Sequence, residues 1–181
     1  SLTDDPSRTA TYEAINIARN SGPVISYDPN YRAALWSDPE TAQLRMQSLI
    51  PYVDMMKISD EETSLLTPYQ DPEEAIQYLL RQGVHLVAVT LGRDGALIGN
   101  ENGIIKAEGF SSHAVDTTGA GDSFWGGFLA SYLQEETSPE HLTRAQMIQF
   151  GRVGNAVASL CVERRGGISA IPEMEEIEER L

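Results

Sequence analysis

Cysteine is nearly absent from this sequence of 181 residues, which contains only Cys161. A single cysteine excludes an internal disulfide and a zinc site built from cysteines. We expect Cys161 to be a small buried hydrophobic residue, because it lies in an apolar segment. The three histidines, His85, His113 and His141, are scattered and lack the spacing of metal ligands. These absences suit a cytoplasmic protein.

Long apolar runs and an excess of basic residues are also missing. No apolar run reaches the roughly 18 residues of a transmembrane helix, so no membrane span is predicted. The opening SLTDDPSRTA is polar, shows no signal peptide and lacks Met, so we expect a processed, tagged or truncated start. The 13 Lys and Arg residues against 27 Asp and Glu give a net charge of −14. This charge argues against nucleic acid and anionic membranes as partners, although a local site can still bind an anion.

Two common phosphate-binding motifs are absent or poorly matched. The pattern GxxxxGK[ST] does not occur, which excludes a P-loop NTPase. The dinucleotide-binding fingerprint is matched only loosely by GAGDSFWG, because the glycine spacing is wrong. An aspartate inside that turn would also repel a pyrophosphate. The sequence therefore disfavours both of these classes.

The sequence does contain a regular alternation of short apolar segments and amphipathic segments. Strands that alternate with helices predict an α/β protein with a mainly parallel sheet and helices on its faces. A hairpin is predicted at one edge of the sheet, where ALIGN and IIKAE flank ENG. The expected parallel strands are 24–28, 53–59 and 86–91, and the expected helices are 6–20, 39–50, 60–66, 71–83, 120–135, 144–164 and a tail from 174.

Polar residues follow each expected parallel strand. The strands end at Asp28, Ser59 and Thr90, which begin the polar stretches DPNYR, SDEE and TLGRDG. Ligands bind beyond the carboxyl ends of the strands in an open α/β sheet. We therefore expect these loops to face one crevice.

The stretch DTTGAGDSFWGGFLASYL, residues 116–133, carries the strongest chemical signal. A glycine-rich turn that enters a helix exposes backbone N–H groups, which suit a phosphate. We expect positive φ at Gly121 within this turn. Asp122 should be ionised in the first helical turn and could accept a proton from an attacking hydroxyl. An ordinary acid that stabilises the helix N-terminus is the alternative.

Two glycines interrupt the apolar helix that follows. Each glycine costs a helix interior about 1 kcal/mol relative to alanine. We expect Gly126 and Gly127 to be close-packing positions that face Gly151 and Gly154 of the next helix. Packing roles are also expected for the two tryptophans, Trp36 and Trp125.

These segments closely resemble the ribokinase-like (PfkB) carbohydrate kinases. The resemblance rests on DTTGAGD, YDPNYR, KISDEETSLLT, VTLGRDGALI and SLCVERRGGISAIP, which occur in the family's order. Among the members, fructokinases are the most similar. The resemblance implies a three-layer αβα Rossmann-like fold and transfer of the γ-phosphoryl of ATP to a sugar hydroxyl with Mg²⁺.

The resemblance also assigns roles around the transferred phosphoryl group. Asp122 matches the base, and the backbone of Gly119, Ala120 and Gly121 matches the anion hole. Glu62 matches a glutamate that organises Mg²⁺ and phosphate through water, while Ser59 stands where that motif has asparagine.

Further roles implied by the resemblance concern ATP and a monovalent cation. Three residues match the loop near the ATP phosphates and ribose, namely Thr90, Gly92 and Gly95. Asn155 lies where the family flanks adenine. Asp116 and Thr118, with the 163–169 segment, match a site for K⁺. Arg32 is either a surface residue or a phosphate-binding or loop-fixing residue.

Family members begin with an N-terminal region that supplies a lid and grips the sugar, and no segment here matches it. Residues 1–181 are therefore expected to be the C-terminal nucleotide-binding and catalytic portion of one sugar kinase domain. Alone, this portion should phosphorylate fructose negligibly and could self-associate or form a homodimer. The alternatives are a non-catalytic nucleotide-binding fragment, or a kinase that acts on another sugar or on a nucleoside.

Overall fold

The computed structural model describes residues 2–181, which form two compact units. The first unit ends at Val87 and the second runs from Ala88 to Leu181. Five strands form one sheet in the order β1-β2-β3-β4-β5, and β3 (Leu86–Thr90) passes from the first unit into the second. The predicted α/β fold with an edge hairpin is confirmed. Among residues 2–181, no helix is long and apolar enough to cross a membrane.

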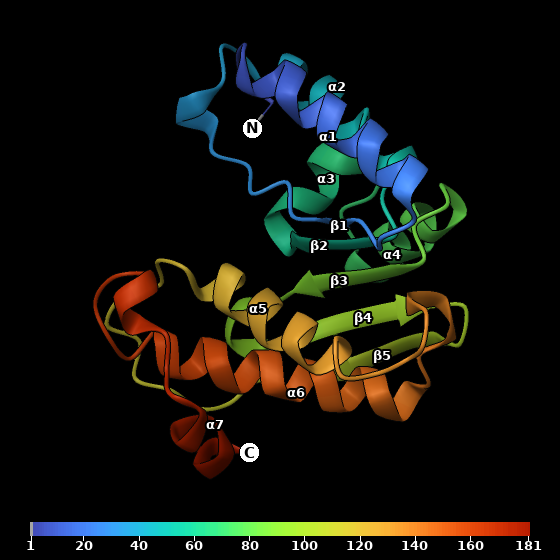
Figure 1. The fold of residues 1–181 in the computed structure, drawn as a ribbon. Helices are drawn as coiled ribbons and strands as arrows, with labels where there is room; N and C mark the ends of the chain where they lie inside the picture. Colours follow the sequence, from blue (N-terminus) through green and yellow to red (C-terminus); the bar gives the residue numbers. More distant parts are fainter. Residues whose placement is uncertain (1) are drawn as a thin grey trace. The chain divides into compact units, whose positions relative to one another are not determined.

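The first unit alternates helices and parallel strands, as Figure 1 shows. Strand β1 pairs in parallel with β2, with Ser26 opposite Met55. Strand β2 is buried at four of its five positions, including the side chain of Lys57. The elements are α1 (Ser7–Ser21), β1 (Ser26–Tyr27), α2 (Pro39–Gln47), β2 (Met55–Ser59), α3 (Thr63–Leu66) and α4 (Pro72–Arg81).

Two helices of the first unit begin where an aspartate precedes a proline. The carboxylate of Asp38 accepts a hydrogen bond from the Thr41 N–H at 2.7 Å, and that of Asp71 accepts one from Glu74 at 3.0 Å. A carboxylate that caps the free N–H groups and a proline at the first helical position are both favourable here. Helix α2 ends at Gln47, earlier than predicted, and Pro51 lies in a short 3₁₀ turn (Ile50–Tyr52). A helix that continued through Pro51 would lack the N–H donor to the Gln47 carbonyl, and the proline ring would collide with that carbonyl.

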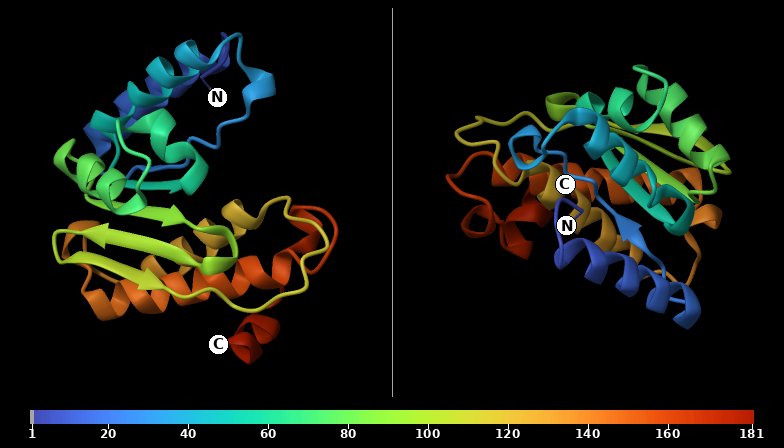
Figure 2. Two further views of the ribbon diagram at one scale, coloured as in Figure 1. Left: turned by 180° about the vertical axis from the view of Figure 1, so that it is seen from behind. Right: turned by 90° about the horizontal axis from the view of Figure 1, so that it is seen from above.

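The second unit places two long helices against a hairpin. Strands β4 (Ala96–Asn100) and β5 (Gly103–Ala107) are antiparallel. Helices α5 (Ala120–Tyr132) and α6 (Arg144–Cys161) lie side by side across one face of this hairpin, as both Figure 1 and the view from behind in Figure 2 show. The short helix α7 (Met174–Arg180) contacts α6 through Ile177.

Glycines set the separation between α5 and α6. A Cβ atom at Gly127 would lie 3.1 Å from the Gly154 Cα, and one at Gly154 would lie 2.7 Å from the Phe124 carbonyl oxygen. The predicted close approach is thus confirmed for this pair. Gly151 instead packs on the hairpin, where a Cβ would lie 2.6 Å from Ile98.

Gly126 corrects the sequence prediction, because it does not take part in this packing. No atom lies within 4 Å of the position that its Cβ would occupy, and the residue is exposed. The expected packing role holds for Trp125, which is buried and stacks on Phe128 with ring centres 5.1 Å apart. Trp36 is half-buried. Cys161 is fully buried, as expected.

Candidate nucleotide and phosphoryl-transfer site

The loop after β3 approaches the end of β5 backbone to backbone. Thr90 ends β3, and a 3₁₀ turn follows (Gly92–Asp94). Gly95 has a φ of +92°, and a Cβ atom there would lie 2.1 Å from the Ala107 carbonyl oxygen. Only glycine fits such a contact, because any side chain would collide with backbone that cannot move aside.

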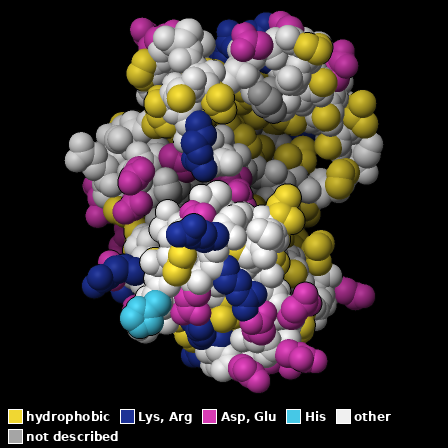
Figure 3. Space-filling model, turned by 90° about the vertical axis from the view of Figure 1, so that its left-hand side faces the viewer, with side chains coloured by type: hydrophobic (Ala, Val, Ile, Leu, Met, Phe, Trp, Pro, Cys, Tyr) yellow, Lys and Arg dark blue, Asp and Glu magenta, His cyan; other side chains and the backbone are white. Residues whose placement is uncertain are grey.

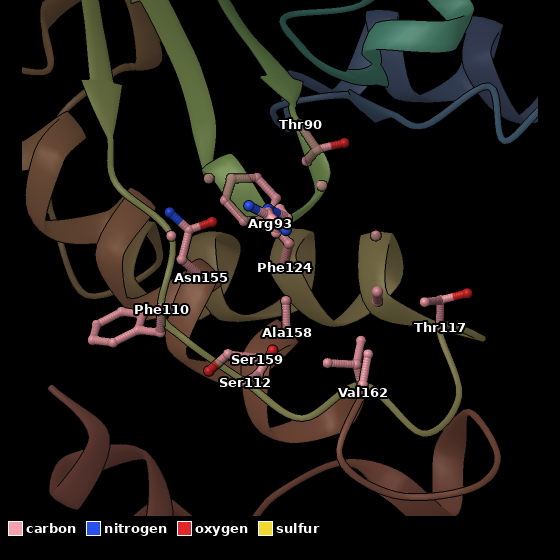
Figure 4. A pocket seen from close by; sticks show the side chains of 16 residues that line it. Thr90, Arg93, Phe110, Ser112, Thr117, Phe124, Asn155, Ala158, Ser159 and Val162 are labelled. Atoms are coloured by element: carbon pink, nitrogen blue, oxygen red, sulfur yellow. The ribbon is translucent and has the colours of Figure 1, made fainter.

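A pocket of about 260 Å³ opens beside this loop within the second unit. It brings together six of the residues singled out from the sequence. They are Thr90, Gly92, Gly95, Ala120, Gly121 and Asn155. Figure 4 shows Asn155 and Phe110 at one end of the pocket and Thr117 at the other. The pocket is therefore elongated, and its two ends differ in chemistry.

One wall of the pocket comes from α6 and its C-cap residue Val162, and of this wall the sequence analysis had singled out only Asn155. It is formed by Asn155, Ala158, Ser159 and Val162, which recur at the spacing of one helical face. That spacing was the available signal. The remaining lining residues that were missed are Arg93, Gly109, Phe110, Ser112, Ala114, Thr117 and Phe124.

The charge of the pocket differs from that of the protein surface. Acidic side chains are spread over the face in Figure 3, in keeping with the net charge of −14. The lining of the pocket carries one charged side chain, Arg93, which is a cation. An anionic ligand can therefore enter this pocket without meeting a carboxylate in its wall.

The N-terminus of α5 forms the opposite end of the pocket. Gly119 is the N-cap residue with φ +79°, so the left-handed residue is Gly119, and the expectation for Gly121 is wrong. Gly121 already belongs to the first turn of the helix. Among residues 2–181, the N–H groups of Gly121 and Asp122 have no acceptor, whereas Ser123 donates to the Gly119 carbonyl at 2.8 Å. Free N–H groups and the helix dipole together favour an anion here.

Asp122 occupies the first turn of α5 but is exposed and does not line the pocket. Its carboxylate receives no side-chain or backbone hydrogen bond from residues 2–181. The carboxylate is therefore available to a molecule that approaches the anion-binding turn from outside the pocket.

Asp116 joins the turn before α5 to the 163–169 segment. One carboxylate oxygen accepts the Gly166 N–H at 3.0 Å and the other accepts the Thr118 N–H at 2.9 Å. The hydrogen bond from Gly166, followed by those from Thr118, lowers the pKa of the Asp116 carboxyl to about 2. Among residues 2–181, no three His, Cys, Asp or Glu side chains gather as a metal site. The K⁺ site expected at Asp116, Thr118 and 163–169 stays a prediction.

The lowered pKa of Asp116 predicts how acid weakens the second unit. A depressed pKa in the folded state means that the stabilisation is complete above the unfolded value of about 4 and is lost as pH falls through about 2. We expect Asp116→Asn to reduce the free energy of unfolding at neutral pH. The difference in this free energy between wild type and variant should shrink as pH falls below about 4. Urea unfolding across this range measures the difference. A difference that is independent of pH would contradict the role of this carboxylate.

In the first unit, Glu62 ties two loops together. It is 6% exposed, and its carboxylate accepts the Tyr31 N–H at 2.6 Å, the Ser59 N–H at 2.8 Å and the Ser59 hydroxyl at 3.2 Å. Ser59 and Glu62 form a capping box around the turn after β2. A carboxylate has about four lone-pair sites, so one remains for a water molecule. The observed contacts and a water-mediated role toward Mg²⁺ are therefore compatible.

Two other residues that follow β1, Asp28 and Arg32, also make hydrogen bonds within the first unit. Asp28 accepts a hydrogen bond from the Lys57 ammonium at 3.0 Å, which pairs the charge of a lysine that is 5% exposed. A buried charge requires such a partner. The guanidinium of Arg32 is exposed and donates to the carbonyl of the adjacent Tyr31 at 2.9 Å, as a surface residue would.

Comparison with known proteins assigns this α/β chain to a family of carbohydrate kinases. The model of the pfkB family carbohydrate kinases matches residues 1–174, and the chain belongs to this family. The fructokinase of Vibrio alginolyticus is 32% identical over 179 residues, which cover 98% of this chain and 57% of that protein.

Solved structures give the same result for the fold. The fructokinase of Vibrio cholerae O395, with fructose, ADP and calcium bound, has a TM-score of 0.90 at 32% identity and is matched over 99% of this chain and 57% of that one. The aminoimidazole riboside kinase of Salmonella enterica has a TM-score of 0.86 at 26% identity, over 98% of this chain and 59% of that one. The chain spans about half the length of the curated relatives it matches.

Proposed function

We propose that this chain binds ATP and supplies the phosphoryl-transfer machinery of a sugar kinase that converts fructose to fructose 6-phosphate. The observation that carries the proposal is a pocket that ends at the free N–H groups of the α5 N-terminus. An elongated pocket with an anion-binding end suits a nucleotide whose phosphates reach that end. The fructose and ADP in the Vibrio cholerae relative support this choice of ligands.

The exposed carboxylate of Asp122 then acts on the acceptor. A sugar hydroxyl placed beside it would transfer its proton to Asp122 as the hydroxyl oxygen attacks the γ-phosphorus. The resemblance assigns the anion hole to the backbone of Gly119, Ala120 and Gly121. The Ala120 N–H donates to the Thr117 carbonyl at 3.2 Å, whereas the N–H groups of Gly121 and Asp122 have no acceptor in residues 2–181 and would stabilise the charge on the transferring group. Thr90, Gly92 and Gly95 line the pocket where the phosphates and ribose of ATP would lie.

Two cations complete the proposal. Mg²⁺, bound with ATP, would neutralise charge on the phosphates, and the family resemblance assigns Glu62 and Ser59 a water-mediated role toward this ion. K⁺ would bind among the backbone carbonyls around Asp116, Thr118 and 163–169. This position fits because Asp116 already fixes the two loops to each other.

Two other functions have an observation in their favour. A nucleoside kinase is favoured by the likeness to the aminoimidazole riboside kinase. A non-catalytic nucleotide-binding role is compatible with a pocket whose anion-binding end suits a nucleotide whether or not transfer follows. A cytoplasmic location and self-association stay predictions.

A kinase assay distinguishes these three functions. It uses the protein in the form that its natural source produces. We expect turnover of about 1–100 s⁻¹ with fructose, and slower turnover with other sugars and with nucleosides. Residues 1–181 alone should bind ATP but phosphorylate fructose negligibly. No segment among them matches the region that grips the sugar in the family, and orienting the attacking hydroxyl can account for about 7–11 kcal/mol of a barrier. A nucleoside as the best substrate would support the second function. Binding of ATP without turnover on any acceptor would support the third.

A further inference from the structure

A side chain of the last helix, Arg180 in α7, reaches the residues around the pocket from outside. Its guanidinium donates to the Glu163 carboxylate and to the Ser159 hydroxyl, each at 3.0 Å. The nitrogen that binds Ser159 also donates to the Ser111 carbonyl at 3.5 Å. The planar guanidinium holds several acceptors in fixed directions at once. One side chain therefore connects α7 with α6, with the segment that follows α6 and with the segment that follows β5.

Residues 110–114, which follow β5, form a second wall of the pocket. Alternate residues of this segment line the pocket, namely Phe110, Ser112 and Ala114. The two residues between them are held through their backbone. Arg180 binds the Ser111 carbonyl, and the Glu163 carboxylate accepts the His113 N–H at 3.4 Å. Arg180 and its partner Glu163 thus fix the chain on each side of Ser112.

Ser159 belongs to the α6 wall and is bound by the same guanidinium. Figure 4 shows Ser159 and Ser112 close together in the lining. The Ser159 hydroxyl donates to the Ala156 carbonyl at 2.8 Å and accepts from Arg180. Without the guanidinium, this hydroxyl and the Ser111 carbonyl would lose a shared donor, and a partly buried acceptor that loses its donor shifts toward another one or toward water. The junction of the two walls therefore depends on Arg180.

Other contacts dock α7 on α6 without Arg180. The side chain of Ile177 packs in a cluster of buried residues from α6, namely Ala156, Val157 and Leu160. Glu176 pairs with Arg164. Loss of the Arg180 guanidinium should therefore leave α7 in place, so that the effect falls on residues 110–114.

We propose that Arg180 is a positioning residue of the nucleotide pocket, which holds residues 110–114 against α6. The inference rests on the proposed function, because that function names ATP as the ligand. Arg180 does not line the pocket, so it acts through the residues that it binds. If Arg180 only stabilised α7, its loss would lower the melting temperature and leave the affinity of the folded protein for ATP unchanged.

The substitution Arg180→Met tests the proposal, because methionine keeps an apolar stem and removes every hydrogen-bond donor. The Kd for ATP is measured by calorimetry on the full chain, well below the melting temperature of each protein. We expect the Kd to rise by at least about threefold, as for other substitutions that act on a site indirectly. A smaller rise would overturn the inference and leave the nucleotide site intact. Failure of the wild type to bind ATP would overturn the proposed nucleotide site and the inference together.

Hydrogen exchange without nucleotide reports on the wall itself. The amides of residues 110–114 should exchange faster in Arg180→Met than in wild type, because the guanidinium holds the chain beside them. The amides of strands β4 and β5 should exchange at unchanged rates. Unchanged exchange across 110–114 would overturn the inference even if ATP bound more weakly.

Glu176 provides a matched control on the same helix. It pairs with Arg164 and accepts the Glu173 N–H at 2.9 Å, and neither partner lines the pocket. Glutamine removes the charge but still accepts this N–H. Glu176→Gln should therefore lower the melting temperature and leave the Kd for ATP unchanged. An equal loss of affinity in Glu176→Gln and Arg180→Met would overturn the assignment, because general loosening of α7 would then explain both.

Discussion

Replacement of Asp122 by asparagine is expected to lower kcat by about 10²–10⁴-fold in the protein as its natural source makes it. Asparagine keeps the shape of the side chain but cannot accept the proton of the attacking hydroxyl. The affinity for ATP should change little, because Asp122 is exposed and does not line the pocket. Steady-state kinetics with fructose and direct titration with ATP measure the two effects.

The alternative role of Asp122, an acid that only stabilises the N-terminus of α5, makes a different prediction. Loss of such a charge lowers stability by about 0.3–1 kcal/mol and leaves the chemical step unchanged. Glu40 is a first-turn acid in α2, so Glu40→Gln is the matched control. Both variants should lose a similar amount of stability, but only Asp122→Asn should lose turnover. If Asp122→Asn retained more than half of the wild-type kcat, Asp122 would have no catalytic role.

Opposite effects on stability are expected from the same substitution at two helical glycines. Gly154→Ala places a Cβ atom 2.7 Å from the Phe124 carbonyl oxygen and 2.8 Å from its ring, so α5 and α6 must separate. Such overpacking costs about 1–3 kcal/mol. Gly126→Ala meets no atom within 4 Å, and alanine favours a helix by up to about 1 kcal/mol.

Thermal unfolding of the chain measures both changes. One kcal/mol corresponds to about 2–4 °C for a domain of this size, so Gly154→Ala should melt several degrees lower and Gly126→Ala slightly higher. Gly154→Ala should also weaken ATP binding, because α5 carries the anion-binding turn and α6 carries a wall of the pocket. If the two variants shifted in the same direction, the packing account of Gly154 would be wrong.

The helix pair shows why the sequence led to a partly wrong assignment of the glycines. A glycine within a helix signals either close packing or open space, and the sequence is the same in both cases. Gly127 and Gly154 contact each other, while Gly151 contacts the hairpin and Gly126 contacts nothing. These outcomes depend on how α5 and α6 are each rotated about their axes. In α5, the burial of Phe124 and Phe128 sets this rotation.

Local physical rules made much of the fold readable from the sequence alone. The alternation of strands and helices, the Asp-Pro helix starts before α2 and α4, and the glycine-rich start of α5 depend on residues a few positions apart. The match of the pfkB family to residues 1–174 confirms the resemblance carried by DTTGAGD. Contacts between distant residues could not be read in this way. The Asn155 amide is fixed by carbonyls 47 and 48 positions away, and Asp116 is fixed by Gly166. Such contacts have no sequence pattern, because the chain must fold before their partners meet.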